Sequence, residues 1–190
     1  ETDESAGLSS LVAAMLRRGT RQHAFQDLNT ALDHVGASID FASSADDAGF
    51  YAQSLAADLD LLLDLLAEML TDPVFPEREW ERVRGQTLTR LNMLETDTGY
   101  RAAETFSRAL YPPGHPYGRS ILGTQETIAA LERADLARFY QSYYHPEQLI
   151  ISVVGAMDAD EVLQRLSEAL GAWDVEAQPA PVTIPSAETP

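Results

Sequence analysis

Apolar residues recur with helical spacing in the first 36 residues and predict two amphipathic helices. In the first helix they follow the i, i+3, i+4, i+7, i+8 pattern of one buried face: Leu8, Leu11, Val12, Met15 and Leu16. Gly19 follows this pattern, and Arg17 and Arg18 place positive charge in the last turn, as at the C-terminal end of a helix. The second helix is predicted from Phe25 to Val35 and ends at Gly36.

A change from helical spacing to alternation predicts a β-hairpin after the second helix. Residues 37–44 have Ile39 and Phe41 on one face of a predicted strand, and residues 46–49 form a turn into a second strand over residues 50–55. Two strands joined by so short a turn pair antiparallel.

The rest of the chain reads mainly as helix. The predicted helices cover residues 59–70, 77–95, 100–110, 124–131, 134–144 and 158–170. Pro and Gly make residues 111–118 a loop, and Gln148–Val154 has the clearest strand pattern in the chain, closed by Gly155. This order predicts an α+β fold, an antiparallel β-sheet with helices packed on one face.

Length and composition divide the chain into a folded part and a tail. Residues 1–173 of the 190 form one predicted domain, and residues 174–190 are a predicted Pro-rich linker to a following domain. The net charge of −17 argues against nucleic acid and anionic membrane surfaces as partners. No apolar run is long enough for membrane insertion, so we expect a soluble protein; the residues leave its compartment open, and we favour the cytoplasm. The absence of cysteine excludes disulfides and thiol chemistry.

The first helix and its Gly19-Thr20 exit resemble the first helix of the insulinase-like metallopeptidases, the family of pitrilysin and the mitochondrial processing peptidase. Active members carry the inverted zinc motif H-x-x-E-H in that helix. Aligned through Gly7 and Gly19-Thr20, the motif falls on Ser10, Ala13 and Ala14. The resemblance therefore implies that both histidine ligands and the catalytic glutamate are absent.

The third zinc ligand of the family is a glutamate on a later helix, which the resemblance places at Thr89, Arg90 or Leu91. None of these side chains binds zinc. We therefore expect no catalytic residue, no metal ligand and no cofactor in this chain, and zinc only in an active partner.

The resemblance extends from about Glu4 to Trp173, and it implies a domain that possibly lacks its first strand. The other stretches that carry it are residues 36–46, His115–Gly118 with Gly123-Thr124, Asp135–Tyr140, His145-Pro146, Val153–Gly155 and Trp173. Their order and spacing, rather than any single motif, indicate the family.

The resemblance implies an inactive (pseudo-peptidase) domain or subunit that completes the peptide-binding chamber of an active H-x-x-E-H partner. In active relatives, the strand matching Asp40, Phe41, Ala42, Ser43 and Ser44 binds substrate peptide by main-chain pairing. These five residues are our candidate peptide or partner contact. An ordinary core-facing strand remains the alternative.

Other chemistry has little support in the sequence. The four histidines include no i, i+4 pair; we expect His23 and His34 on helix surfaces or ends, and His115 and His145 in loops. Glu77, Glu79 and Glu81 are predicted to form a solvated face, interleaved with Arg78 and Arg82. The alternative functions are a purely structural subunit, similar to the core proteins of the respiratory cytochrome complex, and a hydrolase with a relocated site.

Overall fold

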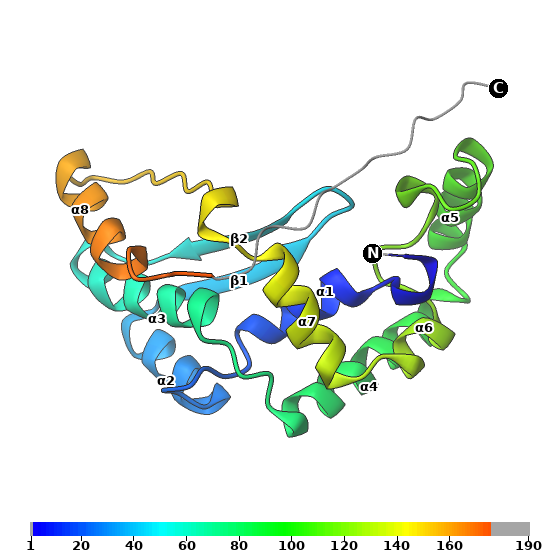
Figure 1. The fold of residues 1–190 in the computed structure, drawn as a ribbon, viewed down its shortest axis with the longest axis horizontal. Coiled ribbons are helices and arrows are strands. Elements are labelled where there is room, and N and C mark those ends of the chain that lie inside the picture. The colour runs from blue at the N-terminus through cyan, green and yellow to red at the C-terminus, as the bar shows by residue number, and fades with distance from the viewer. Residues whose placement is uncertain (1, 176–190) are drawn as a thin grey trace.

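The computed structural model describes residues 2–175 and has an α+β fold, as predicted (Figure 1). Its helices are α1 (Leu8–Leu16), α2 (Phe25–Val35), α3 (Leu59–Thr71), α4 (Glu77–Leu94), α5 (Thr98–Leu110), α6 (Gln125–Ala130), α7 (Arg133–Tyr143) and α8 (Ala159–Leu170). Short 3₁₀ turns are η1 (Asp3–Ser5), η2 (Ala56–Asp58), η3 (Pro116–Gly118) and η4 (Pro146–Gln148). Every predicted helix is therefore present.

The predicted hairpin is also confirmed. Strand β1 (Ser38–Ser43) pairs antiparallel with β2 (Ala48–Gln53), in a register that places Phe41 opposite Phe50. The two rings are 6.1 Å apart between centroids. Within residues 2–175 these two strands make up the whole sheet.

Helix α1 lies at the centre of the core. Val12, Met15 and Leu16 have no exposed surface, and they cluster with Trp80 of α4 and Leu136 of α7. Figure 1 shows α1 in the middle of the molecule, with the hairpin on one side and α4 and α6 on the other. A second apolar cluster joins α2 and α3 beneath β1.

Two glycines fix the start of α1 against the loop that precedes α6. Gly123 has a φ of +74°, and a Cβ there would lie 2.3 Å from the Ala6 carbonyl oxygen. Gly7 has a φ of +95°, and a Cβ there would lie 2.8 Å from the Leu122 carbonyl oxygen. Both positions therefore require glycine, for their conformation and for the close approach of the two backbones.

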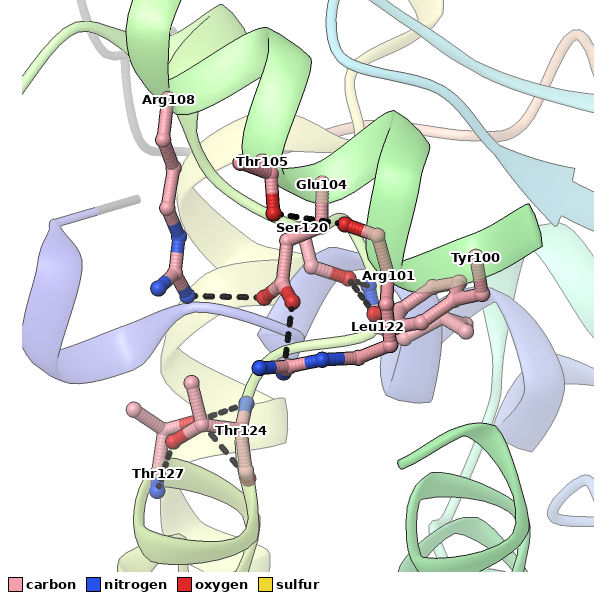
Figure 2. Close-up of polar contacts among 9 residues, drawn as sticks. All are labelled: Tyr100, Arg101, Glu104, Thr105, Arg108, Ser120, Leu122, Thr124 and Thr127. Atoms are coloured by element: carbon pink, nitrogen blue, oxygen red, sulfur yellow. Dashed lines mark hydrogen bonds and ion pairs between the residues drawn. The ribbon is translucent and has the colours of Figure 1, made fainter. Parts of the chain in front are cut away.

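Helix α5 buries none of its residues and carries ion pairs along its own surface. Figure 2 shows Glu104 between Arg101 and Arg108, with carboxylate–guanidinium distances of 3.1 and 2.7 Å. The Tyr100 hydroxyl lies 3.0 Å from the Ser120 hydroxyl, which attaches α5 to the loop before α6.

The strand predicted over Gln148–Val154 is wrong for this structure. Gln148 ends η4, and residues 149–154 are irregular, drawn in Figure 1 as the coil that leads to α8. A strand needs a neighbour to accept and donate its ladder hydrogen bonds, and β1 and β2 are the only strands among the described residues. The local sequence has strand character, but residues 149–154 pair with no strand among residues 2–175.

The predicted tail over residues 174–190 lies outside the described residues, apart from Asp174 and Val175, and stays a prediction. Across residues 2–175, the helices are too short or too polar to cross a lipid bilayer.

Candidate functional site

The face of α1 that carries Ser10, Ala13 and Ala14 is packed rather than open. Ala13 is buried, and Ser10 and Ala14 are half-buried. Ala14 packs against the core cluster that contains Leu11 and Met15. These side chains offer no imidazole or carboxylate, so this part of α1 has no group for acid–base or metal chemistry.

The three positions considered for a third zinc ligand lie near the C-terminal end of α4. Thr89 and Arg90 are exposed, and the Thr89 hydroxyl donates to the carbonyl of Gly85 at 2.9 Å. Leu91 is buried in the same core cluster as Leu11 and Met15 of α1. An apolar contact between α1 and α4 therefore occupies this region.

The histidines do not come together elsewhere. Residues 2–175 contain no group of three or more His, Cys, Asp and Glu side chains that could hold a metal ion. His34 is exposed in the last turn of α2, as predicted. His115 and His145 are in loops, as predicted, and both are buried; the His115 ring stacks on Tyr111 with 4.8 Å between ring centroids.

The candidate contact strand lies beside α1. Asp40, Phe41, Ala42 and Ser43 belong to β1, and Asp40 and Ala42 are exposed. The Ser9 hydroxyl of α1 donates to the Ser43 hydroxyl at 3.4 Å. Among the described residues, β2 is the only strand that pairs with β1, so the other edge of β1 carries backbone groups outside the ladder.

Ser44 differs from the other four candidates because it belongs to the hairpin turn. Its hydroxyl donates to the Asp47 carboxylate at 2.8 Å and accepts from the Asp46 and Asp47 amides at 3.2 and 3.1 Å. Ser44 therefore shapes the turn.

Arg17 connects the last turn of α1 to β1 and α2. Its guanidinium forms an ion pair with Asp40 and donates to the Asn29 side-chain oxygen at 3.3 Å. The Asp40 side chain is 65% exposed, so the pair orients β1 more than it stabilises the fold.

The Gly19-Thr20 exit of α1 is held by a network that the sequence did not predict. The buried Thr20 hydroxyl donates to Glu68 of α3 at 2.9 Å and accepts from the His23 amide at 2.9 Å. The His23 ring nitrogen Nδ1 lies 2.8 Å from the same carboxylate. His23 therefore lies before α2 and contacts α3. In the sequence, Glu68 was visible only as one acidic residue in a predicted amphipathic helix, which did not indicate this network.

Glu79 corrects the prediction of a solvated acidic face on α4. Its side chain is only 14% exposed, and its carboxylate lies 3.7 Å from the guanidinium of Arg18. Burial lowers the pKa of Arg18, the nearby Glu79 opposes that shift, and the guanidinium lies 4.5 Å from the centre of the Phe25 ring. Periodicity alone did not reveal that α1 and α2 cover this side of α4.

A cavity of about 1130 Å³ lies beside the tip of the hairpin. Residues 48–50 of β2, residues 148–152, Tyr117 and Phe139 contribute to its walls. The Tyr117 hydroxyl donates to Asp46 at 2.6 Å, which fixes η3 to the tip of the hairpin.

Comparison with known families identifies the chain. The family model described as Insulinase (Peptidase family M16) matches residues 1–125. The chain belongs to the insulinase family of peptidases. A second model, described as Peptidase M16 inactive domain, matches residues 130–190.

Relatives and solved structures agree with this insulinase-family assignment. The chain is 30% identical to an uncharacterized zinc protease of Streptomyces coelicolor over 169 residues, which cover 89% of this chain and 37% of that protein. It is 25% identical to the human mitochondrial-processing peptidase subunit beta, covering 86% of this chain and 33% of that subunit. The crystal structure of a peptidase M16 inactive domain from Pseudomonas fluorescens superposes with a TM-score of 0.88 at 22% identity, covering 97% of this chain and 44% of that chain. Pitrilysin has a TM-score of 0.82 at 21% identity, covering 98% of this chain and 20% of its own.

This insulinase-family chain spans less than half the length of the relatives it matches. The structural likenesses show that it has the fold of this family.

Proposed function

We propose that this chain is a non-catalytic domain of a zinc metallopeptidase and completes the peptide-binding chamber of an active partner. The observation that carries the proposal is the packed, ligand-free face of α1 at Ser10, Ala13 and Ala14, the positions that align with the zinc motif. Leu91 of α4 is buried in the core cluster that also contains Leu11 and Met15 of α1. This burial supports the proposal, because a zinc site needs converging polar ligands in place of an apolar contact.

The partner would be a domain or subunit with an intact H-x-x-E-H helix. Two findings support such a pairing. The model that matches residues 130–190 is described as an inactive domain, and the human relative is named as one subunit of a peptidase. Zinc would be bound by the partner, where it would polarise the scissile carbonyl and activate water.

The first test is peptide turnover by the purified protein, alone and with its active partner. Alone, it is expected to leave fluorogenic peptides uncleaved. With the partner, turnover is expected to exceed that of the partner by itself and to disappear on addition of a zinc chelator. A partner whose general-base glutamate is replaced by glutamine is the matched control. Chelator-sensitive turnover by the protein alone would refute the proposal.

We also propose that Asp40–Ser43 of β1 contribute main-chain contacts to the peptide in that chamber. Two observations support this role: the outer edge of β1 pairs with no strand among residues 2–175, and Asp40 and Ala42 are exposed. Adding a strand to a sheet edge uses backbone hydrogen bonds, so this role does not require zinc ligands.

N-methylated peptides test this edge directly. A peptide methylated at the backbone nitrogens that face β1 is expected to lose binding to the assembled protein. The same peptide methylated at the alternate nitrogens is expected to retain it, because only every second residue bonds to a given neighbour. Equal binding of the two peptides would contradict a main-chain role for β1.

A further inference from the structure

The outer edge of β1 offers the backbone groups of every second residue. The Ser44 amide donates to the Asp47 carbonyl at 2.8 Å, which makes these two residues a hydrogen-bonded pair at the end of the hairpin. Hydrogen-bonded and non-hydrogen-bonded pairs alternate along an antiparallel ladder, so the even-numbered residues of β1 direct their N–H and C=O groups toward β2. Three residues of β1 therefore direct these groups outward: Ile39, Phe41 and Ser43.

Arg17 contacts groups that lie on opposite faces of β1. Ile39 is buried in the apolar cluster that joins α2 and α3, whereas the next side chain along the strand, Asp40, is exposed on the other face. The Arg17 guanidinium forms an ion pair with Asp40 and also donates to the side-chain oxygen of Asn29 on α2 at 3.3 Å. Because β2 occupies one edge of β1, a contact that joins the two faces crosses the outer edge, beside Ile39.

Asn29 holds the guanidinium in this place. Its side-chain amide donates to the Phe25 carbonyl at 2.5 Å, which directs its oxygen toward Arg17. The Arg17 side chain is 30% exposed and that of Asp40 is 65% exposed, so their ion pair contributes little to stability. A charged side chain over an unpaired strand edge is instead typical of a device that limits which chains can pair with that edge.

We propose that Arg17 determines the specificity of the peptide site by covering the outward backbone groups of Ile39 and ending the peptide ladder at Phe41. This role rests on the proposed main-chain contact of β1 with peptide, and it adds which part of the edge the peptide uses. A docked peptide would bond to Phe41 and Ser43 alone. It would therefore be read over roughly three residues, and the chain beyond them would leave the sheet beside the Arg17–Asp40 pair.

A scan of the peptide's backbone nitrogens tests this role in the protein assembled with its partner. The partner carries glutamine in place of its general-base glutamate, so the peptide stays intact. The probes are short fluorescein-labelled peptides, each with a single N-methyl group at a different position. With the wild type, two alternate positions are expected to weaken binding by about tenfold each, because only the Phe41 and Ser43 carbonyls accept hydrogen bonds from the peptide.

Three variants make the scan specific to Arg17. Arg17→Ala is expected to add one sensitive position and to tighten binding of the unmethylated peptide by about tenfold, because Ile39 becomes free to bond. Asp40→Ala keeps the arginine but releases it from the edge, and the same additional position is expected. Arg21→Ala is the matched control, because the Arg21 side chain is 78% exposed and pairs with Asp72, and its removal changes the net charge equally. Two sensitive positions are expected for this control.

The pattern of sensitive positions separates this role from the proposed function. Three sensitive positions in the wild type, or only two in both Arg17→Ala and Asp40→Ala, would overturn the role of Arg17 and leave the main-chain role of β1 in place. A scan in which no methyl group weakens binding to the wild type would overturn the main-chain role of β1 itself, and that of Arg17 with it.

Discussion

At the scale of single residues, a close backbone contact explains Gly123, and hydrogen bonds explain Thr20 and Thr127. Gly123 lets the loop before α6 approach Ala6, and Thr127 then donates to the Ala6 carbonyl at 2.8 Å. Thr20, after Gly19, donates to Glu68. These residues position α1 whether or not α1 carries zinc ligands. Their presence is therefore compatible with a domain that keeps the fold and has no catalytic site.

Replacing Gly123 with alanine tests this structural role. A Cβ 2.3 Å from the Ala6 carbonyl, at a φ of +74°, forces the backbone to shift. We expect a loss of about 2–4 kcal/mol in the free energy of unfolding, measured by urea denaturation. Gly85→Ala in α4 is the control: a Cβ there meets nothing within 4 Å, and we expect a gain of about 0.5–1 kcal/mol. Equal effects of the two substitutions would contradict the close contact.

At the scale of elements, helical periodicity predicted every helix, because the apolar residues of each segment recur with the period of a helix, including α5, which buries none of its residues. The hairpin was predictable because its strands are neighbours along the chain. Residues 149–154 were wrongly predicted as a strand because local sequence sets strand propensity but not whether a neighbouring strand is there to pair with, and none pairs with them among the described residues. The Thr20–Glu68–His23 network and the burial of Glu79 depend on how helices pack, which local spacing does not specify. For the site, the sequence indicated which positions lack ligands, and the structure added that Leu91 packs into the α1 core cluster.

Two tyrosines at the end of helix α7 are expected to make the protein less stable at alkaline pH. Tyr140 and Tyr144 stack at its C-terminal end, and burial raises the pKa of both hydroxyls. An unfolded tyrosine ionises near pH 10 while these two stay neutral in the fold. The contribution of these two neutral hydroxyls to the free energy of unfolding is therefore complete below pH 10. It is lost as pH rises above 10, by up to about 1.4 kcal/mol per pH unit for each tyrosine.

Urea denaturation at pH 9, 10 and 11 measures this effect, and the chain contains no lysine that would titrate in the same range. Tyr144→Phe is expected to reduce the slope of the unfolding free energy against pH by the amount that corresponds to about one proton. The same slope in the wild type and in Tyr144→Phe would show that Tyr144 ionises equally in both states.

At the scale of the whole molecule, α1 is a central helix of the core. Its apolar face contacts α4 and α7, and Arg17 and Ser9 attach it to β1. The scaffold therefore keeps a helix and a neighbouring strand in the arrangement that the proposal assigns to a peptide chamber, with the hydrolytic chemistry in the partner.

The most direct test of this account is the zinc content of the purified protein, measured by elemental analysis after zinc loading and removal of free metal. We expect far less than one zinc per chain, because Ser10, Ala13, Ala14 and Leu91 offer no ligand. One tightly bound zinc per chain, released together with peptidase activity by a chelator, would contradict it.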